Sequence, residues 1–367
     1  MERILHVVST IGINSGVMSF LMSYYRNINR EEIQFDFLFW VDEDNSYAEE
    51  IRSLGGGVYK VQKPGFSRAS LQSLLLFFKQ NNGCYRIMHL HEVYLNMIVC
   101  PVARKYGFTH IISHCHTTKY SDKWINALRN RVLCLPLKSN VDEFFACSKD
   151  AGEFYYGKKK SMNGKVQIIN NAIDFQKFSY DVEKRKCIRE KMELNNKFVV
   201  GHVGRFNNQK NHDFLIDIFY EIHKKNNNAI LLLVGIGPLE EKIKEKVRRK
   251  LPQNTVIFLG QIHNINEILQ GIDVFILPSL FEGLGIVLIE AQMSGLRCIT
   301  SDAVPKDAQI TENIDFLSLE LSAEKWADTA ISNTIENRYI DRKKIADAGF
   351  DIYVESKKLV DCYLNII

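Results

Sequence analysis

The chain has 367 residues, of which 46% are hydrophobic and 25% charged, and its formal net charge is +4. This length exceeds what one hydrophobic core usually holds, so we expect two domains of roughly 150–200 residues each. The net charge is too small to indicate a nucleic-acid partner, and no apolar run reaches the roughly 18–20 residues that a membrane span needs.

The eight cysteines are spread singly along the chain, without a CxxC pair. This spacing supports neither a zinc site nor a redox motif, and we expect reduced thiols. The N-terminus, Met1-Glu-Arg-Ile-Leu-His-Val-Val, reads as a strand and lacks the charged-then-apolar order of a signal peptide. We therefore expect a cytoplasmic protein.

The first half of the chain predicts strands that alternate with helices. A strand is expected at 4–8, followed by a polar loop at 9–16 that contains Gly12 and Gly16, and then by a helix. Further strands are expected at 34–40, 57–61, 86–91, 109–113, 144–147 and 165–169, and helices at 70–80, 94–106, 122–135 and 148–156. Such alternation is typical of a doubly wound parallel sheet.

Two pairs of histidines lie near strand ends. His114 and His116 are expected to follow a strand directly, and so to lie at the carboxyl edge of the sheet, where ligands bind; ordinary loop residues are the alternative. A metal site is not expected at this pair, because no third ligand lies near it in the sequence. His89 and His91 alternate along another strand, and we expect them to point to opposite faces of the sheet, so that at most one faces a cleft.

The segment from Trp124 to Lys138 mixes apolar and basic residues. Such a segment can rest on a membrane interface, where basic side chains meet anionic lipid. The alternative, which we favour, is a helix whose apolar side faces the core and whose arginines are solvated.

After a boundary near Tyr180, the second half of the chain repeats the pattern. A charged helix at 181–194 precedes strands at 198–203, 229–234, 255–259 and 273–277, and the end is helical from about residue 323, with a last segment at 351–364. The strand at 198–203 leads into a loop that carries Arg205 and Lys210. A planar guanidinium and a mobile ammonium at the carboxyl end of a parallel sheet suit a pyrophosphate, although solvated surface cations are the alternative.

The strand at 273–277 leads into a second candidate anion site. Pro278 ends the strand, and a helix is expected to open near Gly285, where unpaired amide groups and the helix dipole attract a phosphate. Glu282 on the turn and Glu290 in the helix flank this site. Because carboxylates repel an anion, we expect them to bind neutral hydroxyl groups attached to it. The alternative is an ordinary strand–helix unit with two solvated acids.

Three motifs therefore occur in one half of the chain: Gly204-Arg205 with Lys210, Gly235-Ile-Gly237-Pro238, and Glu282 with Glu290. Together they resemble the retaining, nucleotide-sugar-dependent GT-B glycosyltransferases of family 4. Residues 144–148, 201–206 and 281–292 are similar to the branch found in bacterial exopolysaccharide and capsule assembly, and the resemblance covers nearly the whole chain. It implies an α/β fold of two Rossmann-like, doubly wound domains that face a central cleft. The acceptor is expected in domain 1–178, with the C-terminal helix 351–367 crossing back onto it, and the donor in domain 179–350.

The resemblance also implies roles for individual residues. Glu290 is expected to hold the ribose hydroxyls of the donor and Glu282 the hydroxyls of the transferred sugar. The expected catalytic residues are Glu282, His114, Arg205 and Lys210, and the expected acceptor residues are His114 and His116. The expected donor-binding residues are Gly16, Arg205, Lys210, Gly235, Gln261, Ile262, His263, Glu282, Gly283, Leu284, Gly285, Ile286 and Glu290.

Two departures from the family pattern leave details open. Ser15-Gly16 stands where the family has Gly-Gly, which leaves open how closely the first loop approaches the donor. The arginine that often follows the Leu259-Gly260 turn is absent, which leaves the base preference open.

The activity that the resemblance implies is transfer of a sugar, with retained configuration, from a nucleotide-diphosphate donor to a saccharide acceptor in surface polysaccharide biosynthesis. A UDP-sugar is the favoured donor, and the acceptor is expected to be linked to a lipid such as undecaprenyl diphosphate. No metal and no cofactor besides the nucleotide-sugar co-substrate is expected, because the cations and the helix terminus take the place of a metal ion. No nucleic acid is expected as a partner, and association of the N-terminal domain with the inner face of the cell membrane is left open. The alternatives are a GT-B UDP-sugar 2-epimerase and a non-catalytic nucleotide-sugar-binding protein.

Overall fold

The computed structural model describes residues 1–121, 123–262, 264–332 and 338–366, and it divides into two compact units. The N-terminal unit comprises Met1–Ile173 and Gly349–Ile367, and the C-terminal unit comprises Asp174–Ala348. The chain passes from one unit to the other a few residues before the boundary predicted from the sequence. The reason is that Asp174 already caps helix α9 (Phe175–Phe178), which packs against α13 (Ile265–Gly271) and α14 (Ile286–Met293) of the C-terminal unit.

The N-terminal unit is built on a seven-stranded parallel sheet with the order β3-β2-β1-β4-β5-β6-β7. The strands are β1 (Glu2–Val7), β2 (Ile33–Phe39), β3 (Val58–Lys60), β4 (Ile87–Leu90), β5 (His110–Cys115), β6 (Glu143–Ala146) and β7 (Val166–Ile168). The helical segments are α1 (Gly16–Asn27), α2 (Ala48–Ser53), α3 (Arg68–Gln80), η1 (Val93–Leu95), α4 (Asn96–Lys105), α5 (Trp124–Leu133), α6 (Leu137–Asn140), α7 (Lys149–Tyr156), α8 (Lys158–Met162) and α17 (Ile352–Leu364). The strand order reverses between β1 and β4, which is the point where open sheets of this kind bind ligands.

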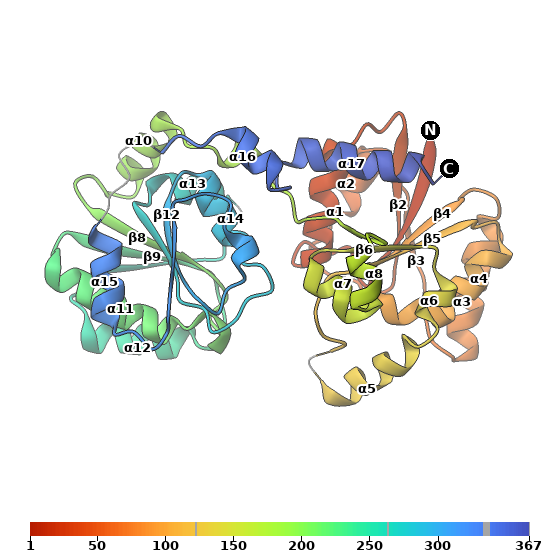
Figure 1. Cartoon of the computed structure of the whole chain (residues 1–367), viewed down its shortest axis with the longest axis horizontal. Coiled ribbons are helices and arrows are strands. Elements are labelled where there is room, and N and C mark those ends of the chain that lie inside the picture. Colours follow the sequence, from red (N-terminus) through yellow and green to blue (C-terminus); the bar gives the residue numbers. More distant parts are fainter. Residues whose placement is uncertain (122, 263, 333–337, 367) are drawn as a thin grey trace. The chain divides into compact units, whose positions relative to one another are not determined.

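Each face of this sheet is covered by its own apolar core. Leu5 and Val7 of β1 belong to the core under α3 and α4, while Ile4 belongs to the core under α1 and α17. This division follows from the alternation of side chains along a strand. Helix α17 lies beside α1 (Figure 1), so the end of the chain completes the N-terminal unit.

The C-terminal unit has a six-stranded parallel sheet with the order β10-β9-β8-β11-β12-β13. The strands are β8 (Phe198–Val203), β9 (Ala229–Val234), β10 (Val256–Gly260), β11 (Val274–Leu277), β12 (Arg297–Ser301) and β13 (Ile314–Leu317). The helical segments are α9, α10 (Val182–Lys191), η2 (Asn208–Lys210), α11 (His212–Lys225), α12 (Glu240–Lys250), α13 (Ile265–Gly271), α14 (Ile286–Met293), η3 (Lys306–Ala308), α15 (Ala323–Ser332) and α16 (Arg342–Asp347). The sheet lies between helices in Figure 1, and the buried Trp326 of α15 belongs to its core.

The predicted class of two doubly wound α/β domains is confirmed. Strands β8 and β9 have the predicted bounds, but β12 and β13 were not predicted. Both are short and mix polar with apolar residues. The pairing of β12 with β11 and of β13 with β12, rather than any local periodicity, makes them strands. Within the described part of the chain, no helix combines the length and the apolar character needed to cross a bilayer.

Candidate active site

Two loops of the C-terminal unit lie against each other at the carboxyl edge of its sheet. One follows β8 and the other follows β11, and these strands are neighbours. The backbone amide of Leu280 donates to the carbonyl of Gln209 at 2.8 Å, and Gln209 Nε2 donates to the carbonyl of Phe281 at 3.1 Å. The two predicted anion-binding segments, about 70 residues apart in the sequence, are therefore one structural unit.

The Glu282 carboxylate is held by donors from both loops. Lys210 Nζ lies 2.7 Å from Glu282 Oε1, and Ser279 Oγ donates to the same oxygen at 2.6 Å. Gln209 Nε2 donates to the other oxygen at 3.2 Å. The side chain of Glu282 is only 7% exposed and that of Lys210 15%, so the pair is largely shielded from solvent screening. The arrangement fixes the orientation of the carboxylate and leaves the ammonium group two further N–H donors.

The partners of Glu282 show what sequence reasoning missed. The prediction assigned Lys210 to the diphosphate and Glu282 to the sugar, whereas the structure joins the two side chains to each other. Gln209 and Ser279 were not singled out. Only their position on the same two loops could have indicated them, because a lone glutamine or serine carries no motif.

Arg205 differs from Lys210 in its surroundings. It is exposed, and its side chain makes no hydrogen bond or ion pair with any residue that the structure describes. Its loop is supported from behind by Gly235, whose φ of +133° suits glycine. A Cβ atom on Gly235 would lie 2.1 Å from the carbonyl oxygen of Gly204. Gly235 therefore holds the backbone that presents Arg205.

The turn after β11 leaves open space at the start of α14. A Cβ atom on Gly283 would meet nothing within 4 Å, and Gly285 caps the helix with a φ of +80°. The first amides of α14 have no partners within the helix, so this terminus can accept an anion. Glu290 lies one turn further along in a half-buried position. Desolvation raises the pKa of its carboxyl to about 7, and the nearby Lys177 partly opposes this shift.

The remaining predicted donor residues of this unit follow β10. Gln261 is exposed and Ile262 is partly exposed. Their loop starts at the same edge of the sheet as the loop after β9, because the amide of Gly235 donates to the carbonyl of Gly260 at 2.8 Å. His263 lies outside the described residues. The predicted donor-binding residues of the C-terminal unit thus come from loops after four adjacent strands, β8 to β11.

The structure corrects two expectations about the histidines of the N-terminal unit. His114 does not follow its strand but lies within β5 and is fully buried, while His116 comes directly after the strand end and is partly exposed. His89 and His91 do not point to opposite faces: their rings stack with centroids 4.3 Å apart. Residues two apart in a strand share a face, so the expectation applied the strand period wrongly.

His114 and His116 also have a third potential metal ligand beside them, contrary to expectation. One ring nitrogen from each of His91, His114 and His116 lies within 4.8 Å of the other two. The predicted donor residue Gly16 lies elsewhere in this unit, as the exposed first residue of α1. Ser15 caps that helix by accepting from the amide of Met18 at 3.3 Å, which gives the departure from the Gly-Gly pattern a structural role.

The favoured interpretation of the Trp124–Lys138 segment was wrong as well. Within α5, only Asn130 is buried. Trp124, Leu128 and Val132 recur at helical spacing and are 77%, 58% and 54% exposed. The apolar side of this helix therefore faces away from the core.

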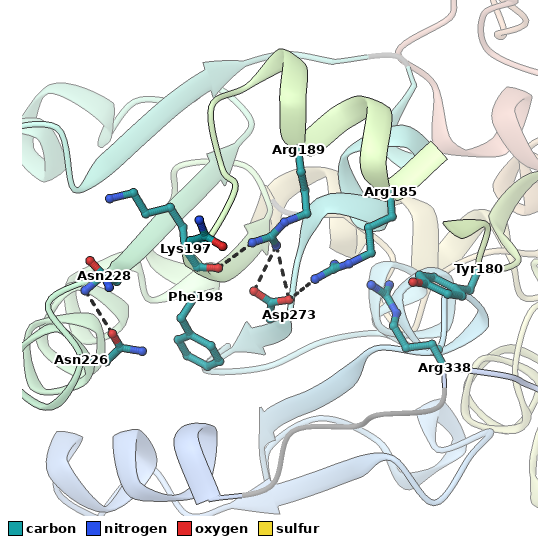
Figure 2. Close-up of a pocket in the computed structure, with 11 residues that line it drawn as sticks. Tyr180, Arg185, Arg189, Lys197, Phe198, Asn226, Asn228, Asp273 and Arg338 are labelled. Carbon is teal, nitrogen blue, oxygen red and sulfur yellow. Dashed lines mark hydrogen bonds and ion pairs between the residues drawn. The ribbon is translucent and has the colours of Figure 1, made fainter. Parts of the chain in front are cut away.

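A charged cavity of about 480 Å³ lies at the opposite, amino edge of the C-terminal sheet (Figure 2). Arg185 and Arg189 bond Asp273, and Arg189 also donates to the carbonyl of Lys197. Arg338 donates to the carbonyls of Leu269, Gln270, Ile272 and Ser294, and burial together with the nearby Arg185 lowers its pKa to about 10. These arginines bind the end of α13 and the start of β11, so their role is structural.

Comparison with known proteins places this geometry in a family. Residues 184–350 match the family described as "Glycosyl transferases group 1". The chain is 32% identical to the "Putative glycosyltransferase EpsF" of Bacillus subtilis (strain 168), over 99% of this chain and 96% of that protein. It is 26% identical to the Escherichia coli "UDP-Gal:alpha-D-GlcNAc-diphosphoundecaprenol alpha-1,3-galactosyltransferase", over 81% of this chain and 79% of that protein.

Solved structures agree in fold. The crystal structure of Anabaena Alr3699/HepE in complex with UDP superposes with a TM-score of 0.78 at 16% identity, and the match covers 100% of both chains. At this identity the likeness concerns the fold, which is the pair of Rossmann-like domains of GT-B glycosyltransferases. The 32% identity to EpsF over almost the full length extends the relationship to the whole chain. The chain belongs to the group 1 glycosyltransferase family and has the GT-B fold.

Proposed function

We propose that this glycosyltransferase transfers a sugar, with retention of configuration and without a metal ion, from a UDP-sugar to a lipid-linked saccharide in surface polysaccharide biosynthesis. The observation that carries the proposal is the Glu282 carboxylate, fixed by Lys210 and Ser279 beside the open space over Gly283. The E. coli relative, whose name specifies a UDP-sugar donor and a diphosphoundecaprenol acceptor, and the UDP complex of the structural neighbour support the choice of donor and acceptor.

Arg205 and Lys210 are the groups proposed to bind the diphosphate. The unengaged guanidinium of Arg205 can bind two phosphate oxygens at once, and Lys210 can turn a remaining N–H toward the leaving group while it keeps Glu282 in place. The amides at the start of α14 add further donors. Charge that develops on the diphosphate is thereby stabilised by preorganised groups, which is the role that a metal ion has in other transferases.

The two glutamates are proposed to bind hydroxyl groups rather than to act as nucleophiles. Three donors bind the Glu282 carboxylate. Because an ionised carboxylate offers about four lone-pair sites, it can still accept a hydrogen bond from a sugar hydroxyl. Glu290 would accept from the ribose hydroxyls. With no nucleophile assigned, the acceptor hydroxyl attacks the anomeric carbon on the face from which the phosphate departs. The proton of that hydroxyl passes to an oxygen of the leaving diphosphate, and retention follows.

The exposed apolar side of α5 is proposed to rest on the anionic inner leaflet of the cell membrane. Trp124, Leu128 and Val132 would enter the interface, and Arg129 and Arg131 on the same helix would pair with lipid phosphates. Association with vesicles that contain anionic lipid should fall for Leu128→Glu and for raised salt. Binding of Leu128→Glu to these vesicles as strong as that of the parent protein would contradict this placement.

Incubation with a panel of UDP-sugars, with and without a lipid-linked saccharide, tests the proposed activity. UDP release that depends on the acceptor, and an α-linked product from an α-linked donor, are the expected results. Formation of an epimer without acceptor would instead support the 2-epimerase, and tight UDP binding without turnover on any acceptor would support a non-catalytic binding protein. Glu282→Gln should slow transfer, because it removes the charge that pairs with Lys210, whereas the matched control Glu312→Gln should not, because the side chain of Glu312 is 92% exposed.

A further inference from the structure

Five histidines gather on one face of the N-terminal sheet: His6 of β1, His89 and His91 at β4, and His114 and His116 at β5. His6 lies directly opposite His89 in the parallel register of β1 and β4. The first four are at most 6% exposed. Phe20 of α1 lies over the cluster, with its ring 5.3 Å from that of His114 and 5.4 Å from that of His116. The cluster is outside the donor-binding loops of the C-terminal unit.

Hydrogen bonds link the rings in a definite order. His6 Nδ1 lies 3.0 Å from His91 Nε2, and His91 Nδ1 lies 2.8 Å from His116 Nε2. In a second branch, His89 Nε2 lies 3.2 Å from His114 Nδ1, and His89 Nδ1 lies 2.6 Å from the Tyr363 hydroxyl. The other nitrogen of His114, Nε2, is buried and has no hydrogen-bond partner among the described residues. A buried polar atom in this state is costly, and His6 Nε2 in the same cluster is also without a partner among the described residues.

The rings are in the state that metal binding needs. Burial and the neighbouring histidines lower the pKa of His89, His91 and His114 well below the ordinary value. The imidazoles are therefore neutral at pH 7, and each has a lone pair to donate.

We propose that His91, His114 and His116 bind a divalent transition-metal ion of the zinc class. The inferred ligand atoms are His91 Nδ1, His116 Nε2 and the unpartnered His114 Nε2. Nitrogens bound at about 2.0–2.1 Å in a tetrahedral site lie roughly 3.3 Å apart. His91 Nδ1 and His116 Nε2, now 2.8 Å apart, have to separate by about half an ångström, and the three rings start with one nitrogen of each within 4.8 Å of the others.

The remaining members of the cluster fit the role of supporting residues. His6 bonds the other ring nitrogen of His91, and His89 bonds the other ring nitrogen of His114. Tyr363 of α17 in turn bonds His89. Such outer partners fix the tautomer and the orientation of ligating imidazoles. His116, which is partly exposed at the end of β5, provides the entry path and leaves the fourth position to water.

A second triad, His6, His89 and His91, also has ring nitrogens within 4.8 Å of one another. It is buried throughout and offers no exposed member as an entry path. The outer triad is therefore the better candidate, and variants of His116, which belongs to the outer triad alone, distinguish the two. The inference does not rest on the proposed transferase activity, which needs no metal.

The test uses tag-free, full-length protein that has been stripped with a chelator and then titrated with Co²⁺ or Zn²⁺. We expect one ion per chain, a visible Co²⁺ absorption band typical of four-coordination, and a rise in melting temperature with Zn²⁺. His116→Gln and His91→Gln should each weaken the affinity for Zn²⁺ by about tenfold to 100-fold. His116→Cys should retain it, because a thiolate is also a zinc ligand.

Controls keep the test decisive. His110→Gln, at the start of the same strand but outside the cluster, should bind the metal as the parent does. Cooperative urea unfolding of the N-terminal unit in each metal-free variant shows that this unit is folded, and binding of UDP separates failure of the metal site from failure of the donor site. Absence of a stoichiometric ion, or tight binding that persists in His116→Gln, would overturn the proposal.

Discussion

The carboxyl edges of the two sheets have the same backbone geometry but different chemistry. In the C-terminal unit, Arg205 is exposed and unengaged, and Lys210 and Glu282 form an ion pair at the edge of open space. In the N-terminal unit, the corresponding edge holds neutral histidines that bond one another and are covered by the ring of Phe20. The first edge is suited to bind an anionic ligand. The second holds uncharged imidazoles and is suited to bind the proposed metal ion. One fold, used twice, therefore supports two kinds of site through its loop and strand-end residues.

The largest expected effect concerns the ion pair. Lys210→Ala removes a stabilising cation and leaves the Glu282 carboxylate without its charged partner. We expect the rate of transfer to fall about 100-fold to 1,000-fold, which corresponds to roughly 3–4 kcal/mol of transition-state stabilisation. Steady-state kinetics with a UDP-sugar measure this, with Lys242→Ala as a control on the surface helix α12. Near-normal transfer by Lys210→Ala would remove the charged edge from the mechanism.

Two glycines at the same edge are expected to have different roles: Gly235 supports the loop that carries Arg205, and Gly283 leaves space for the ligand. Gly235→Ala places a methyl group 2.1 Å from the Gly204 carbonyl, so we expect it to lower the free energy of unfolding by about 2–3 kcal/mol. Gly283→Ala meets nothing in the protein and should leave stability unchanged while it weakens binding of the donor. Urea unfolding and calorimetric titration with UDP check the pair. Equal loss of stability in both variants would contradict the open space over Gly283.

The buried histidines of the N-terminal sheet predict a pH dependence of the stability of that unit. Burial lowers the pKa of His6 to about 3. Below about pH 6.5 the unfolded chain therefore binds a proton at His6 and the folded unit does not. Stability should therefore fall as pH drops below about 6.5, by about 1.4 kcal/mol per pH unit for each histidine that stays neutral. Urea-dependent hydrogen exchange on metal-free protein reports the two units separately. The pH slope should be smaller in His6→Asn and unchanged in His110→Gln, and a slope independent of His6 would contradict a neutral cluster.

The smallest expected effect concerns Glu290. Its pKa of about 7 means that a fall in pH from 8 to 6 protonates the carboxyl that is proposed to accept from the ribose. Only the ionised form offers all its lone pairs, so affinity for UDP should fall about threefold to tenfold over this range. In Glu290→Gln the affinity should be lower at pH 8 and nearly independent of pH. An unchanged pH profile in that variant would assign the ribose to another residue.

Local signals in the sequence were sufficient for much of the fold and part of the site. The apolar runs at 198–203 and 229–234, each closed by glycine, determined β8 and β9, and Pro278 with Gly285 marked the end of β11 and the start of α14. These features depend on short-range sterics and hydrogen bonding, which a few adjacent residues decide. The motifs around Arg205 and Glu282 indicated the family, which comparison confirmed.

Tertiary structure alone decided which side chains meet. The pairing of Lys210 with Glu282, of His6 with His91, and of Tyr363 with His89 joins residues far apart in the chain. The strand character of β12 and β13 and the exposure of the apolar side of α5 likewise depend on which neighbours are present. Contacts of this kind follow from strand order and sheet register, which no local pattern of residues encodes.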